Sequence, residues 1–149
     1  MVSRSQSIED ILSLVKKGVK DSYFQAKRIS SFFERENKID SCYAIWKFLK
    51  TNVEYQRESK ELQTVKTLSR LLLMDRKGDC KHFSTAVATL LTSLNIPFFF
   101  RLVSFNHFDK SPTHIYIVAN INGKKIPIDC CLKKFNTEPP YKYKTDYYA

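Results

Sequence analysis

The chain has 149 residues, of which 43% are hydrophobic, 13% aromatic and 27% charged, values that suit one soluble globular domain with its own core. This composition argues against intrinsic disorder, no apolar run approaches the roughly 20 residues of a membrane span, and the start of the chain lacks the apolar stretch of a secretory signal. The net charge of +10 is spread along the chain, which favours a solvated basic surface over contact with nucleic acid or another anionic surface, although both interpretations stay open.

The first half of the chain predicts helices. Ser7 is a predicted N-cap, and apolar residues follow it at helical spacing, with a break near Gly18 left open. A second helix is expected to be capped by Asp40 or Ser41 and to end near Asn52. The stripe of the first helix consists of Ile8, Ile11, Leu12, Val15 and Val19.

Two less regular stretches separate these helices from a third one. Residues 54–64 are polar and predict no regular structure, and residues 65–74 predict a short helix or turn. A further helix is expected from about Cys80 to Leu94, because apolar residues line one side of it. Asn95, followed closely by a proline, ends this helix.

The period of the sequence then changes to that of strands. Strands are predicted over residues 97–105, 113–121 and 124–130, and Asn122-Gly123 is a strong signal for a two-residue hairpin turn. The tail, residues 133–149, is rich in Tyr and Lys and is expected to be an edge strand or an arm. Helices followed by an antiparallel meander predict an α+β domain, here a single domain over residues 1–149.

A cysteine stands where a loop becomes the third helix. Asp79 is a natural N-cap, which places Cys80 in the first turn, where free backbone N–H groups and the helix dipole favour a thiolate. Gly78 has no side chain, so the backbone just before Cys80 can pass close to neighbouring groups. From this position alone, Cys80 is interpreted equally well as a nucleophile or as a buried structural cysteine.

A nucleophilic thiol needs a base and a group that orients the base. His114 begins the second strand and Asp129 ends the third, eight residues before and six residues after the hairpin turn. Because these strands are antiparallel, a slight offset or a bulge brings the two side chains together. The sequence therefore predicts a Cys80–His114–Asp129 constellation.

These motifs resemble the transglutaminase-like superfamily, in its branch of short bacterial and phage-type domains. The shared pattern is a Gly-x-Cys helix start, a helix ending in Leu-Gly-Ile-Pro, a His opening a strand and an Asp closing the next. Asn95 replaces the usual Gly, a mild departure. The resemblance covers about residues 45–132, so residues 1–40 and the tail lie outside it. Its motifs are residues 77–84, 90–97, 113–117 and 128–129.

The resemblance implies a papain-like core in which the Cys80 helix packs on an antiparallel sheet. It implies that Cys80 is the nucleophile, His114 the general base and acid, and Asp129 the orienting carboxylate. Gln63 is the candidate side chain for stabilising the oxyanion, with Gln56 as its rival. A solvated loop amide is the competing interpretation of either glutamine.

The function expected from this resemblance is thiol-dependent acyl transfer to a protein or peptide substrate. A peptidase or amidase acting through an acyl-thioester on Cys80 is favoured over cross-linking of the transglutaminase type. The alternative is a non-catalytic structural or binding module of a phage virion or mobile element. A cytoplasmic or virion-associated protein in a reducing compartment is expected, without disulfides or a cofactor.

The remaining histidines and cysteines are given plainer roles. His82 is expected to point away from the site as a surface or supporting residue, and His107 is read as a loop residue. Cys130 should fill the core, and Trp46 is also expected to be a core residue. A zinc site made of Cys80, His82, His114 and Cys130 matches the usual ligand spacing poorly, so no metal is expected.

Overall fold

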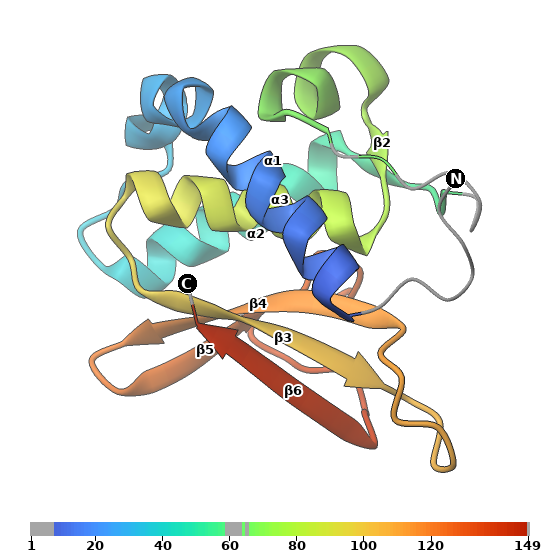
Figure 1. Cartoon of the computed structure of the whole chain (residues 1–149). Coiled ribbons are helices and arrows are strands. Elements are labelled where there is room, and N and C mark those ends of the chain that lie inside the picture. Colours follow the sequence, from blue (N-terminus) through green and yellow to red (C-terminus); the bar gives the residue numbers. More distant parts are fainter. Residues whose placement is uncertain (1–7, 59–63, 65, 149) are drawn as a thin grey trace.

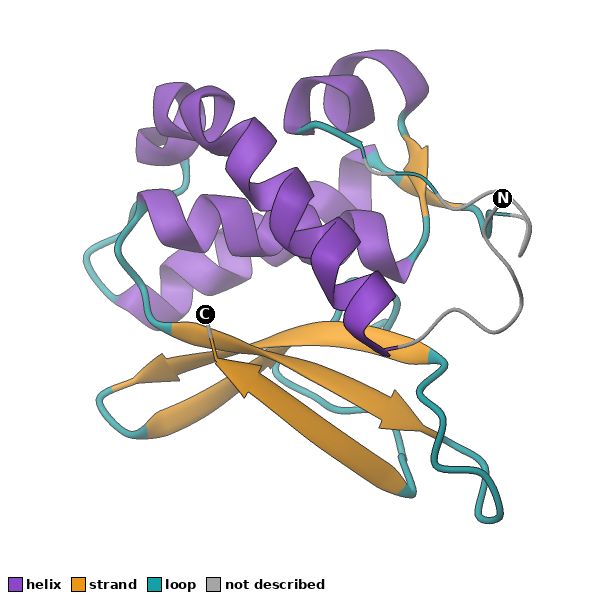
Figure 2. Ribbon diagram, viewed as in Figure 1, coloured by secondary structure: helices purple, strands orange, loops and turns teal. Residues whose placement is uncertain are grey.

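The computed structural model describes residues 8–58, 64 and 66–148. Helices lie on one face of an antiparallel sheet whose strand order is β5-β4-β3-β6 (Figures 1 and 2). This arrangement confirms the predicted α+β fold. The helices are α1 (Ile8–Ile29), α2 (Lys38–Asn52) and α3 (Cys80–Ser93), and the strands of this sheet are β3 (Phe98–Ser104), β4 (His114–Ile121), β5 (Lys124–Ile128) and β6 (Tyr143–Tyr148).

The two N-terminal helices differ from the prediction in detail. Helix α1 continues through Gly18 without the break left open above, and the 3-10 turn η1 (Ser30–Phe32) follows it. The predicted cap Ser7 lies outside the described residues. Helix α2 is capped by Asn37, whose side chain accepts a hydrogen bond from the Ile39 N–H at 2.8 Å. The expected caps Asp40 and Ser41 instead lie inside the first turn, because the backbone is already helical there.

A short parallel strand pair precedes α3. Strand β1 (Glu54–Tyr55) pairs with β2 (Lys77–Gly78), and the π-helical turn η2 (Arg70–Asp75) lies between them. The prediction of an irregular stretch at residues 54–64 missed β1, since two residues are too few to show a strand period. The pair matters for the site because it fixes Tyr55 beside Gly78, two residues before Cys80.

The sheet follows the predicted meander. Asn122 and Gly123 both have positive φ, 53° and 82°, as a two-residue hairpin turn requires. The predicted left-handed end of α3 is confirmed by a φ of 58° at Asn95. In the tail, β6 pairs antiparallel with β3 at the edge of the sheet, which confirms the edge strand and excludes the free arm.

Helix α3 lies in the middle of the core. Nearly all of its side chains are buried, between α1 on one side and β4 on the other. Burying one aliphatic side chain stabilises the folded state by about 1.5–3 kcal/mol. The many buried side chains of α3 therefore fix the position of this helix firmly. The residues of β4 in the same core cluster are Ile115, Ile117, Ala119 and Ile121. None of the helices that the structure describes has the length and apolar character to span a bilayer.

Candidate active site

The start of α3 is held by a reciprocal cap. The Asp79 side chain accepts the Lys81 N–H at 3.0 Å, and the backbone N–H of Asp79 donates to His82 Nδ1 at 2.9 Å. The predicted cap is thereby confirmed, and Cys80 is the first residue of the helix. Its backbone N–H points along the positive end of the helix dipole, where a thiolate or an oxyanion is stabilised.

A buried charged cluster surrounds this cap. Lys81 Nζ lies 2.7 Å from Asp79 Oδ2 and 3.2 Å from Glu58 Oε1, and the side chains of Lys81 and Asp79 are only 6% and 8% exposed. His82 is buried too, and its Nε2 lies 3.2 Å from the Thr64 carbonyl oxygen. The surface interpretation of His82 is therefore wrong: its ring closes the cap and ties α3 to the preceding loop.

Gly78 is needed because the chain passes very close to the first turn of α3. A Cβ at this position would lie 2.8 Å from the His82 Cβ and 3.0 Å from Leu71 Cδ1. We expect Gly78→Ala to cost about 1–3 kcal/mol of unfolding free energy and to lower the alkylation rate of Cys80, measured by mass spectrometry. Gly123→Ala is the control, since it strains a distant turn and should leave Cys80 reactivity unchanged. Unchanged reactivity in Gly78→Ala would contradict this view of the close approach.

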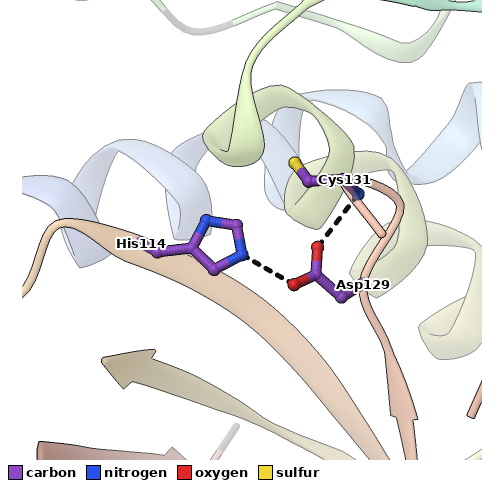
Figure 3. Close-up of side chains that lie close together, drawn as sticks. All are labelled: His114, Asp129 and Cys131. Atoms are coloured by element: carbon purple, nitrogen blue, oxygen red, sulfur yellow. Dashed lines mark hydrogen bonds and ion pairs between the residues drawn. The ribbon is translucent and has the colours of Figure 1, made fainter. Parts of the chain in front are cut away.

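His114 and Asp129 come together at the end of the sheet. His114 Nε2 lies 2.7 Å from Asp129 Oδ2, and Figure 3 shows the imidazole and the carboxylate facing each other. Asp129 follows β5 directly and is 3% exposed. The last paired residues of the two strands are Ile117 and Ile128. His114 lies three residues beyond this pair and Asp129 one residue beyond it, which is the offset between the two strands that the sequence predicted.

The Cys80 thiol lies on the other side of the same imidazole. Burial lowers the pKa of His114, but hydrogen bonds with Asp129 and Cys80, together with their charges, outweigh burial and raise it from 6.5 to about 10. Because Nε2 faces Asp129, Nδ1 is the ring atom left for Cys80. The His114 imidazole is therefore held between the Asp129 carboxylate and the Cys80 sulfur.

Two further residues support Asp129 and were not assigned to the site from sequence. The Trp46 indole N–H donates to the backbone oxygen of Asp129 at 3.1 Å, and the Cys131 N–H donates to Asp129 Oδ1 at 3.0 Å. Trp46 is a core residue as predicted, yet its polar end positions Asp129. Cys131 lies beside the His114–Asp129 pair (Figure 3), a position that was not predicted from the sequence.

The other predicted residues take different places. Gln63 lies outside the described residues, whereas Gln56 is exposed and its backbone N–H donates to the Gly78 oxygen at 2.8 Å. His107 is an exposed loop residue, as expected. Cys130 is buried in the core, also as expected. The four-residue zinc set considered from sequence is therefore not assembled, because Cys130 and His82 face other surroundings.

Comparison with protein families matches residues 15–123 to the transglutaminase-like superfamily. The matched segment contains Cys80 and His114 and ends before Asp129. It also begins well before residue 45, so it takes in most of α1, which the sequence motifs had left outside the resemblance. No curated protein matches the chain significantly in sequence.

Solved structures of similar fold include two bacterial proteins and a TGase. A candidate protease from Parabacteroides distasonis has a TM-score of 0.65 at 17% identity, covering 80% of this chain and 26% of its own. A candidate cysteine protease from Cytophaga hutchinsonii has a TM-score of 0.56 at 22% identity, covering 73% and 38%. The TGase has a TM-score of 0.50 at 17% identity, covering 93% and 36%. The chain thus spans about a quarter to two fifths of these proteins' lengths, and the likeness shows a fold used by thiol-dependent enzymes.

Proposed function

Because the chain belongs to the transglutaminase-like superfamily, we propose that it is a thiol-dependent acyl-transfer enzyme in which Cys80 is the nucleophile. His114 is the general base and acid, and Asp129 holds the imidazole in its orientation. The observation that carries the proposal is the placement of one imidazole between the Asp129 carboxylate, at 2.7 Å, and the Cys80 thiol at the start of α3.

The first half of the reaction forms an acyl-thioester. The Cys80 thiolate attacks the carbonyl carbon of an amide, and the negative charge moves to the carbonyl oxygen. The Cys80 N–H faces that oxyanion from the helix start. When the C–N bond breaks, His114 gives its proton to the leaving amine, and Asp129 stabilises the ring throughout.

The second half releases the acyl group. His114, now neutral, takes a proton from water, which attacks the thioester carbonyl and expels the Cys80 sulfur. Water as the acceptor makes the protein a peptidase or amidase, the reaction we favour; an amine acceptor would make it a cross-linking enzyme. Among the described residues Gln56 is the candidate oxyanion donor, because its backbone N–H donates to the Gly78 oxygen and so keeps it near the start of α3.

Exposed aromatic side chains flank the proposed nucleophile and base. Tyr55 is 51% exposed and lies opposite Gly78 on the neighbouring strand. Phe105, 44% exposed, places its ring 6.0 Å from the His114 ring. Apolar surface on both sides of a reactive thiol suits a peptide with a bulky apolar side chain near the bond that is cleaved.

The rate of alkylation tests the activated thiol without knowledge of the substrate. We expect iodoacetamide near pH 6 to modify Cys80 first, because its sulfur lies at a helix N-terminus and beside an imidazole, the surroundings in which thiols are reactive. His114→Ala should slow this reaction at least about tenfold, and Asp129→Asn should slow it less, since the ring is kept. Peptide mapping by mass spectrometry at several times gives the rate for each cysteine.

The other cysteines are controls within the same chain. Burial raises the pKa of Cys42 to about 12 and also raises the pKa values of Cys130 and Cys131. These three thiols should therefore react slowly in every variant. Equal labelling of all four cysteines, unchanged in His114→Ala, would contradict the proposal and favour a non-catalytic module, such as a virion component.

A further inference from the structure

Three side chains with different metal-binding atoms lie close together at the end of the sheet, although the sequence contains no metal-binding motif. The ring nitrogen of His114, a carboxylate oxygen of Asp129 and the Cys131 sulfur all lie within 4.8 Å of one another, on the side chains drawn in Figure 3. They come from the start of β4 and from the turn after β5. We propose that His114, Asp129 and Cys131 form a binding site for a zinc-type divalent cation, which competes with the proton that these groups use in catalysis.

The ligand set selects the class of cation. Zinc is bound by Cys sulfur, His nitrogen and Asp oxygen, usually in tetrahedral geometry, whereas magnesium and calcium take oxygen ligands. Three protein ligands leave the fourth position of the tetrahedron to water, because Cys80 lies on the other side of the imidazole from Asp129 and cannot reach a cation bound at Nε2.

The distance between His114 and Asp129 needs only a small adjustment. Two ligands bound at about 2.0–2.1 Å to a tetrahedral ion stand roughly 3.3 Å apart. His114 Nε2 and Asp129 Oδ2 are 2.7 Å apart with a proton between them, so a cation replaces the proton if the pair separates by about half an ångström.

The surroundings already orient the ligands. Asp129 Oδ1 is held by the Cys131 N–H, which leaves Oδ2 as the coordinating oxygen, and the Trp46 indole fixes the Asp129 backbone. Such supporting hydrogen bonds are a regular feature of metal sites. Cys131 and His114 are both partly exposed, so an ion can reach them.

A second group of possible metal ligands is not proposed as a metal site. Glu58, Asp79 and His82 also lie within 4.8 Å of one another. There, however, the Lys81 ammonium already lies 2.7 Å from Asp79 and 3.2 Å from Glu58. A bound cation would meet this buried positive charge, so metal binding is assigned to the His114 cluster.

Occupancy would regulate the enzyme. A cation on His114 removes the base that serves Cys80, so acyl transfer stops and resumes when a chelator takes the ion away. This inhibitory consequence rests on the proposed function. Metal binding itself does not, because it needs no substrate.

Titration with Zn²⁺ and Co²⁺ tests the site on the full chain after treatment with a chelator. We expect one Co²⁺ per chain, with a thiolate-to-cobalt charge-transfer band and the intense visible bands of tetrahedral cobalt. Cys131→Ser should lower the Zn²⁺ affinity at least about tenfold and weaken the charge-transfer band. Cys130→Ala, a change at the neighbouring core cysteine, is the matched control and should leave both unchanged.

The outcomes separate this inference from the proposed function. Metal binding that depends on Cys131 supports the site even if the protein fails to form an acyl-thioester. No binding of either ion at micromolar concentration overturns it, and so does a cobalt spectrum that is the same in wild type and in Cys131→Ser. If circular dichroism shows that Cys131→Ser folds poorly, Cys131→Ala replaces it in the same titrations. The presence or absence of the thiolate-to-cobalt band in the wild type then also decides whether a cysteine binds the ion.

Discussion

Cys80→Ala should abolish acyl transfer while leaving the fold intact. We expect the burst of p-nitrophenolate released from p-nitrophenyl acetate to fall by at least about 10³-fold, because no other thiol has both a helix start and an imidazolium beside it. The measurement is stopped-flow absorbance with substrate in excess. Cys130→Ala is the matched control and should keep the burst. An undiminished burst in Cys80→Ala would place the chemistry elsewhere.

The same assay shows whether the three residues act as a unit. His114→Ala should lower the burst rate by about 10²–10⁴-fold, since it removes both the base and the cationic partner of the thiolate. Combined with Cys80→Ala, it should cost little more than Cys80→Ala alone, because groups of one catalytic unit are not additive. Additive losses would contradict a shared mechanism.

The second large effect concerns stability at the start of α3. Asp79→Ala should lower the unfolding free energy by about 2–4 kcal/mol, because it removes the cap and the nearer of the two carboxylates that pair with the buried Lys81 ammonium. Urea unfolding measures the loss. Asp21→Ala is the control: Asp21 pairs with Lys17 at 2.6 Å on the surface, and such exposed pairs contribute less than about 1 kcal/mol.

A double-mutant cycle isolates the charge pair from the cap. Asp79→Asn keeps a capping side chain, so its cost in the wild type reports mainly the lost charge. In a Lys81→Met background that cost should shrink by more than about 1 kcal/mol, since the cation that pairs with Asp79 is gone. An equal cost in both backgrounds would show that the pair at 2.7 Å does not stabilise the helix start.

The same pair predicts an acid-dependent loss of stability. Burial raises the pKa of Asp79, but contacts with His82 and Lys81 outweigh it and hold the pKa well below the usual 3.8. A depressed pKa contributes stability above 3.8 and loses it as the pH falls towards the folded value. The difference in unfolding free energy between wild type and Asp79→Asn should therefore narrow below about pH 4.

Local signals in the sequence were enough to predict the helix carrying Cys80. An acidic cap at Asp79, an apolar side on the helix and Asn95 at its left-handed end are features of adjacent residues, and the structure has all three. The meeting of His114 and Asp129 was predicted for a similar reason, because the short hairpin turn fixes which residues of two strands lie opposite each other.

Features that depend on distant packing were not predicted. Nothing local shows that the Trp46 indole reaches the Asp129 carbonyl, 83 residues away, or that His82 is enclosed by a loop before the helix. Cys130 was predicted to fill the core, but nothing in the sequence predicted that Cys131 would lie beside His114 and Asp129. The two cysteines differ because β5 ends at Ile128 and the chain turns at Asp129, which sends one sulfur into the core and the other to the site.

Intact-mass analysis of a trapped acyl-enzyme tests the central claim most directly. After mixing with p-nitrophenyl acetate and quenching in acid, the protein should gain the mass of one acetyl group, mapped to Cys80 and released by neutral hydroxylamine as a thioester is. Cys80→Ser should lack this hydroxylamine-labile adduct, and His114→Ala should form it slowly. Acetylation confined to lysines, or spread equally over the four cysteines, would contradict an activated nucleophile at Cys80.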